Sequence, residues 1–273
     1  MKKITILAIA LLVTSMTRAQ VIVAPTVLFM NDQSRFGTFV VMNRSNVPQE
    51  ISVSFKFGFP ESDSAGNIRM QYSDSTMAAA HSCQTWVKGF PQKFVVNPEQ
   101  QQVVRLLVTP PANLSDGEYW TRLVTSSTPQ AKTIDTVKTG ITANITFVLE
   151  QVTTIIYKKG NAETKVDLPK VEIKQDSASL NILAYATKGG NSPFFGKITA
   201  TIFDKAGNNL FSQDEVIAIY RDNMTLKFSA PIAKLPEGSY TAEIKLSSER
   251  TDISQDDLLK TASVEKTIPF AIQ

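Results

Sequence analysis

The longest alternating stretch in the chain lies between Gly140 and Tyr157. From Ile141 to Leu149 the odd positions are all apolar, whereas the even positions are Thr, Asn, Thr and Val. A period of two places alternate side chains on one face of an extended chain, so this stretch predicts a long β-strand with one apolar face. It ends at a polar break, 158–161, near the middle of the chain. We therefore expect a strand that closes one domain and leads directly into a second.

Other short apolar segments recur on both sides of this stretch, separated by turn residues. The polar segment 60–80 is expected to be a loop or a pair of short strands, and only 255–260 suggests a turn of helix. Many short strands at this spacing are typical of β-sandwiches. The chain is therefore predicted to be all-β, with two Ig-like β-sandwich domains in tandem, at residues 20–158 and 159–273. The predicted strands are 21–30, 37–42, 50–59, 86–96, 102–108, 119–126, 170–174, 179–187, 196–204, 209–217, 224–228, 240–247 and 262–272.

A short internal echo supports two copies of one architecture. The segment Leu114–Tyr119 reads Leu-Ser-Asp-Gly-Glu-Tyr, and Leu235–Tyr240 reads Leu-Pro-Glu-Gly-Ser-Tyr. In sandwich folds a tyrosine near the start of the penultimate strand can hydrogen-bond back across the preceding corner, where glycine permits a tight backbone. Both copies are expected to form such corners.

The N-terminus has the pattern of a secretory signal peptide. Lys2 and Lys3 precede an apolar segment, 4–13, that is too short to cross a membrane, and cleavage is expected after Ala19. Lys2, Lys3 and Arg18 would leave with the signal, which takes the formal charge from +3 to zero. We therefore expect an exported protein with no membrane span; the periplasm as its location comes only from the family resemblance given below. Its charge gives no reason to expect nucleic acid as a partner.

Catalytic chemistry has one starting point in the sequence, the segment His81-Ser82-Cys83. These are the only histidine and the only cysteine of the chain, so no intramolecular disulfide can form. A cysteine and a histidine can supply a nucleophile and its base or ligate a metal, but a half-buried thiol beside an ordinary histidine is the simpler interpretation. No nucleophile elbow and no phosphate-binding glycine loop is present. We expect no enzyme activity, no metal site and no cofactor.

Four loop segments begin with Asp followed by Ser or Thr, at Asp63, Asp74, Asp135 and Asp176. The pattern resembles the O-glycan acceptor motif of Bacteroidota. Turns by themselves favour Asp and Ser, because these side chains hydrogen-bond to the nearby backbone. Both interpretations stay open.

The first half of the chain, about 21–158, resembles the PapD-like periplasmic pilus chaperones. The matching segments are the opening strand and Val40–Ser45, Phe94–Pro98 with Gln102–Leu107, Leu114–Trp120, and the long strand ending at Lys158. The second half matches only as a further Ig-like domain. The missing basic anchors described below and the Asp-Ser/Thr motifs favour a divergent member from the Bacteroidota.

The resemblance implies that the last strand of the first domain is donated to an incomplete subunit, as an added β-strand. Ile145, Phe147 and Leu149 match the donor positions; alternatively they face the core of their own domain. The family also anchors the client's terminal carboxylate with two basic residues, and these positions carry Thr26 and Thr154 here. Threonine lacks the charge-assisted strength of a cation, so Arg105 and Arg122 are further candidates for the anchor.

Two functions from different classes follow. The first is a non-enzymatic periplasmic chaperone or assembly factor that binds secreted or fimbria-like subunits by strand donation, with an outer-membrane assembly partner. The second is a structural or adhesion scaffold of the cell envelope built from Ig-like domains. A client that dissociates on assembly would favour the first, and a permanent complex the second. A cysteine enzyme at Cys83 is a third, weaker interpretation.

Overall fold

The computed structural model describes residues 21–130 and 147–272. Within them almost all of the regular secondary structure is β-strand, which confirms the predicted all-β class. The described residues form two compact units. Unit 1 takes 21–56, 84–110, 121–130 and 147–155, and unit 2 takes 57–83, 111–120 and 156–272. Residues 1–20, with the predicted signal peptide and its cleavage site, lie outside the described residues.

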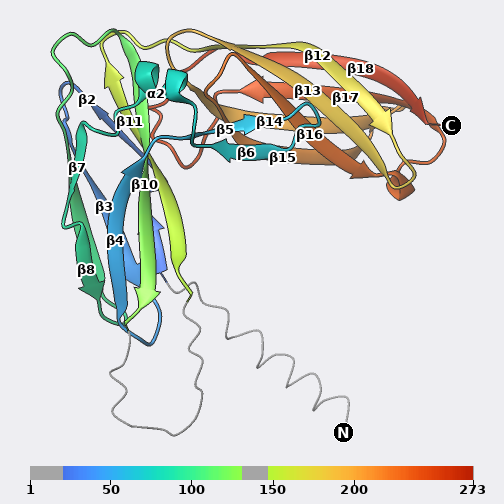
Figure 1. Ribbon diagram of the computed structural model, residues 1–273. Coiled ribbons are helices and arrows are strands. Elements are labelled where there is room, and N and C mark those ends of the chain that lie inside the picture. Colours follow the sequence, from blue (N-terminus) through green and yellow to red (C-terminus); the bar gives the residue numbers. More distant parts are fainter. Residues whose placement is uncertain (1–20, 131–146, 273) are drawn as a thin grey trace, which may run out of the picture. The chain divides into compact units, whose positions relative to one another are not determined.

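Unit 1 contains two facing β-sheets (Figure 1). One sheet has the order β1 (Val21–Ala24), β3 (Phe36–Asn43), β9 (Gln101–Val108), β7 (Val87–Phe90). The other has the order β2 (Val27–Asn31), β11 (Leu149–Lys159), β10 (Gly117–Pro129), β4 (Gln49–Lys56), β8 (Lys93–Val96). Alternate residues of both sheets are buried, as the two facing layers of a sandwich require. The buried residues include Met30, Phe39, Val41, Ile51, Val53, Val104, Leu106, Leu123 and Ile155.

Two of the predicted strands are each two strands in the structure. The segment 21–30 breaks at Pro25, so β1 pairs with β3 in one sheet whereas β2 lies beside β11 in the other. The segment 86–96 breaks at Pro91–Gln92, so β7 pairs with β9 and β8 pairs with β4. Proline has no N–H to donate to a ladder, so a chain that changes sheets can do so at a proline at little cost.

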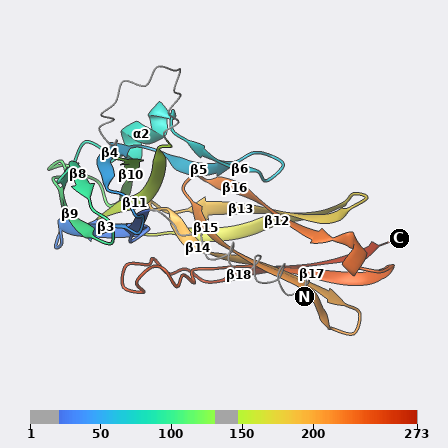
Figure 2. The ribbon, with the colours of Figure 1, turned by 90° about the horizontal axis from the view of Figure 1, so that it is seen from below.

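Unit 2 contains a second sandwich, whose two layers Figure 2 shows. One sheet has the order β12 (Lys165–Gln175), β13 (Ser179–Gly189), β16 (Asn223–Pro231). The other has the order β15 (Asn209–Ile219), β14 (Phe194–Asp204), β17 (Gly238–Ser247), β18 (Val264–Ile272). All seven predicted strands of the second half are present. One core joins the layers, with Leu180, Ile182, Leu226 and Phe228 from the first sheet and Ile198, Ile202, Ala242 and Ile244 from the second.

Two short helical elements and a hairpin complete the described chain. The segment 60–80 contains the hairpin β5 (Phe59–Ser62) and β6 (Ile68–Gln71), as one of the two expectations had it, and then α2 (Ser75–His81). The helix was not predicted, because seven residues show too little of a 3.6-residue period to be recognised. The start of α2 does carry a local signal, because Asp74 is its N-cap: the Asp74 carboxylate accepts a hydrogen bond from the Met77 N–H at 2.9 Å. A 3-10 turn, η1 (Ile232–Lys234), follows β16, whereas 255–260 forms turns only.

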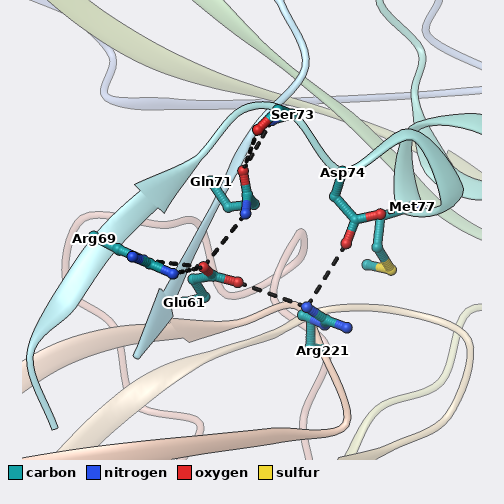
Figure 3. Close-up of polar contacts among 7 residues, drawn as sticks. All are labelled: Glu61, Arg69, Gln71, Ser73, Asp74, Met77 and Arg221. Carbon is teal, nitrogen blue, oxygen red and sulfur yellow. Dashed lines mark hydrogen bonds and ion pairs between the residues drawn. The ribbon is translucent and has the colours of Figure 1, made fainter. Parts of the chain in front are cut away.

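The hairpin and α2 belong to unit 2 although they come from the first half of the sequence (Figure 3). Arg221, which follows β15, lies 3.6 Å from the Glu61 carboxylate and 3.7 Å from that of Asp74. The backbone N–H of Thr225 in β16 also donates to the Ser62 hydroxyl at 2.7 Å. The units therefore do not correspond to one cut in the sequence, and the domain limits 20–158 and 159–273 stay a prediction.

The two tyrosine corners predicted from the internal echo are both present. The Tyr119 hydroxyl donates to the carbonyl of Ser115 at 3.0 Å, and the Tyr240 hydroxyl donates to that of Pro236. Each bond spans four residues. Gly117 has a φ of +136°, and a Cβ there would lie 2.8 Å from the Asn191 carbonyl oxygen. Glycine at this corner is therefore required both by the backbone angle and by the space.

Candidate partner-binding site

The segment leading into β11 and the first residues of this strand expose several apolar side chains. Phe147 is 81% exposed and Val148 60% exposed, and Leu149 and Val152 are exposed as well. Two of the three predicted donor residues, Phe147 and Leu149, are thus on the surface and not in the core of unit 1. The third, Ile145, lies outside the described residues. Sequence reasoning did not single out Val148 and Val152, because they fall on the even positions of the alternation.

The rest of β11 is buried and held in its sheet. Residues 153–157 are all buried. The Thr154 N–H donates to the Thr26 carbonyl at 2.9 Å, just before β2 begins. On the other side, the Ser127 hydroxyl of β10 donates to the Leu149 carbonyl at 3.4 Å. These bonds fix the strand at both ends of its exposed part.

The outer edge of β11 is longer than the strand beside it. In the order β2–β11–β10 the outer neighbour β2 has five residues, whereas β11 has eleven. Part of β11 therefore has no strand at its outer side among the described residues. An open strand edge presents N–H and C=O groups that another chain can pair with. Open edge and exposed apolar side chains together are the two requirements for strand addition.

Three of the four candidate anchor residues meet at one place in unit 1. Arg122, on β10, is only 6% exposed, and its Nη1 donates to the Thr154 hydroxyl. Thr154 in turn donates its backbone N–H to the Thr26 carbonyl. The two threonines predicted as anchor residues thus lie next to a buried arginine from a neighbouring strand. A guanidinium and a hydroxyl together can bind a carboxylate through charge-assisted hydrogen bonds.

The fourth candidate, Arg105, is not part of this cluster. It lies on β9, in the other sheet of unit 1, directly opposite Thr38 of β3 and Phe90 of β7. Its side chain is exposed. The sequence could not separate Arg105 from Arg122, because both belong to strands whose sheet assignment depends on the tertiary fold.

The His81–Cys83 segment has a chemistry poorly suited to a nucleophile. Cys83 is fully buried, and burial raises the pKa of its thiol, so the thiolate is disfavoured. His81 stacks on Trp120 with ring centroids 4.9 Å apart. Burial, aided by Lys188, lowers the pKa of His81. The cysteine is therefore core, and the histidine packs against an aromatic neighbour.

Neither a metal-binding cluster nor a membrane-crossing helix is found in the described part of the chain. No group of three or more histidine, cysteine, aspartate or glutamate residues is placed to hold a metal ion in 21–130 and 147–272. Over the same ranges, none of the helices has the length and apolar character that a membrane crossing would need.

Comparison with known proteins finds similarity only to solved structures. Neither a family model nor a curated protein matches the chain. The CsuC chaperone, solved in a pre-assembly complex with the tip subunit CsuE of Csu pili from Acinetobacter baumannii, is 10% identical with a TM-score of 0.47, over 92% of this chain and 98% of that one. The Pseudomonas aeruginosa chaperone CupB2 is 12% identical with a TM-score of 0.46, over 92% and 100%. The periplasmic chaperone SfaE is 12% identical with a TM-score of 0.42, over 90% and 98%.

Proposed function

We propose that the protein is a non-enzymatic extracytoplasmic chaperone or assembly factor that binds a protein subunit by strand addition at the beginning of β11. The observation that carries the proposal is a group of four exposed apolar side chains, Phe147, Val148, Leu149 and Val152, just before and at the beginning of a strand whose outer edge is partly open. Main-chain hydrogen bonds from this edge would supply affinity, and Phe147 and Leu149 would fill a groove in the client. The signal-like N-terminus supports a periplasmic location.

The cluster of Thr26, Arg122 and Thr154 is the proposed anchor for a carboxylate of the client. Its arginine is buried next to a hydroxyl, an environment in which a charge-assisted bond to an incoming carboxylate is strong because water competes little. Arg122 would therefore take the role of the two basic residues that the family resemblance implies at positions 26 and 154, where this chain has threonines. Arg105 is exposed on the other sheet of unit 1 and is therefore not part of the proposed anchor.

The test compares co-purification of wild type and Phe147→Asp from the native periplasm. A charge buried against an apolar groove costs several kcal/mol, enough to lose the subunit. Thermal melting of the free protein accompanies it, and Val216→Asp is the matched control, since Val216 is an exposed apolar residue of β15 in unit 2. We expect Phe147→Asp to lose the subunit at an unchanged melting temperature, while Val216→Asp keeps it.

Other outcomes would reject the proposal in different ways. A lower melting temperature of Phe147→Asp would show that the residue stabilises the free protein. Retention of the subunit by Phe147→Asp would place the binding edge elsewhere. A subunit that binds through Phe147 but never dissociates during assembly would favour the envelope scaffold, the alternative function.

A further inference from the structure

A second apolar surface of unit 1 lies on the outward side of the β1–β3–β9–β7 sheet. The inward residues of β3 and β9, such as Phe39 and Val104, are fully buried. The alternate residues point the other way, as the two-residue period of a strand requires. Among these, Phe36 is 72% exposed and Phe90 77% exposed. We call this side the outer face.

The strand registers make the outer face continuous. Phe36 of β3 is opposite Leu107 of β9, which is opposite Lys88 of β7. In the next row Arg105 of β9 is opposite Phe90 of β7. Directly opposite residues of an antiparallel pair lie within about 5.5 Å of each other, so these side chains adjoin.

Two more rows extend the outer face toward β1. Val40 of β3 lies between Ala24 of β1 and Val103 of β9, and Ile22 of β1 is opposite Met42 of β3. Phenylalanine side chains present roughly 200 Å² each, so Phe36 and Phe90 alone expose roughly 300 Å². Exposed Ile22, Val103 and Leu107 add to this. The total reaches the size of apolar patches that mark interaction sites on monomeric proteins.

The charge of the outer face is of one sign. Arg105 and Lys88 are exposed on it, and the four strands β1, β3, β7 and β9 contain no aspartate or glutamate. Neither cation forms an ion pair with another residue of the described ranges. An apolar surface that carries cations without ion-pair partners is complementary to an apolar surface that carries carboxylates.

Three kinds of occupant differ in how well they complement this surface: a second copy of the chain, an anionic lipid surface and another protein. A second copy of the chain docked face to face would place cations against cations with no carboxylate between them, which is repulsive. An anionic lipid surface attracts polybasic segments by about 1 kcal/mol per cation, and recognition generally takes four or more cations, whereas the outer face has two. A protein surface with apolar side chains and a carboxylate can pack against the two phenylalanines and form an ion pair with Arg105.

We propose that the outer face of the β1–β3–β9–β7 sheet is a second protein-docking surface, which binds an apolar segment of a partner through Phe36 and Phe90 and pairs a carboxylate of that segment with Arg105. The surface is on the sheet that does not contain β11, so it does not depend on strand addition. A chaperone that delivers a client needs a surface of this kind if client and second partner are bound at once.

The test uses a phage-displayed library of random peptides selected on the full mature chain. Counter-selection is on the double variant Phe36→Ser/Phe90→Ser, whose melting temperature should equal that of wild type because both rings are exposed. We expect selected peptides that combine apolar residues with Asp or Glu. Their binding should weaken about tenfold or more with Arg105→Glu, as expected when a desolvated charge pair is reversed. Lysine in place of the peptide's carboxylate should restore binding to Arg105→Glu.

Matched controls use exposed residues of unit 2. Val216→Ser and Lys245→Glu, on β15 and β17, should leave peptide binding unchanged, as should Phe147→Asp at the client site. The proposal is overturned if the selected peptides bind the double serine variant equally, or if they need no carboxylate. It is also overturned if no peptide is enriched while vesicles of phosphatidylglycerol, or a second copy in sedimentation equilibrium, bind in a way that Phe90→Ser abolishes.

Discussion

The last strands of the two sandwiches, β11 and β18, have contrasting surfaces. Each follows a strand that begins with a tyrosine corner. β18 is paired with β17 along its whole length, from Val264 to Ile272, and its alternate apolar residues pack against the unit 2 core. The segment leading into β11 and its first residues instead expose Phe147, Val148 and Leu149.

The exposed residues of the two strands also differ in polarity. β18 carries Glu265, Thr267 and Pro269 on its exposed positions, which are residues that protect a sheet edge against pairing. The apolar run at the start of β11 has no charge before Glu150. An exposed apolar segment beside an open edge invites aggregation unless a partner covers it, so the contrast accords with a binding role for β11 and a structural role for β18.

Charge substitutions of one phenylalanine on each strand give the largest expected difference. Phe270 of β18 is partly buried against the unit 2 core and stacks on Tyr240 with ring centroids 5.5 Å apart. Phe270→Asp should lower the free energy of unfolding by about 3 kcal/mol, because it removes this packing and desolvates a charge. Phe147→Asp should change it by less than about 0.5 kcal/mol. Denaturant unfolding measures both values, and equal losses would erase the contrast between the strands.

The corner motifs differ at the residue between glycine and tyrosine. Glu118 is 1% exposed, whereas the equivalent Ser239 is exposed. Burial raises the pKa of the Glu118 carboxyl to about 8; Lys158 opposes this effect, and Asp257 adds to it. Neither carboxyl oxygen has a hydrogen-bond partner among the described residues. The first corner therefore holds a neutral acid in the folded protein near neutral pH.

This buried acid predicts a pH dependence of stability. Between the unfolded pKa of about 4.5 and the folded pKa of about 8, the folded state binds a proton that the unfolded state has released. The free energy of unfolding should therefore decrease as pH rises, by about 3 kcal/mol between pH 5 and pH 8. Glu118→Gln stays neutral and should remove this part of the slope. Urea unfolding of both proteins at several pH values tests it, and parallel curves would contradict the assignment.

Removing the two corner hydroxyls gives the smallest expected effect and tests what the motifs share. Tyr119→Phe and Tyr240→Phe each delete one hydrogen bond to a carbonyl four residues earlier. Each should cost about 1 kcal/mol of unfolding free energy, as single neutral hydrogen bonds do. The double variant should lose the sum, since distant sites are additive. A cost at only one corner would show that the two similar sequence segments do not contribute equally to stability.

Much of the fold could be predicted because strand alternation and turn residues are local signals. The seven strands of the second half and the Tyr119 and Tyr240 corners follow from local patterns, whereas the hairpin at 59–71 was one of two open alternatives for its segment. The splits at Pro25 and Pro91 were missed because a segment that alternates on both sides of a proline looks like one strand. The helix at 75–81 was missed because it is barely two turns long.

The candidate sites depended more on the tertiary structure. Alternation marked Phe147 and Leu149 as one face of a strand but could not say whether that face is covered; burial in the fold shows that it is not. Arg105 and Arg122 were equal candidates until the sheet order placed Arg122 beside Thr154 and Arg105 on the outer face. The sequence by itself determined which residues share a face, because the period of a strand is fixed by backbone geometry. Only the tertiary structure decided which faces are buried and which strands adjoin, because these depend on pairings between residues far apart in the chain.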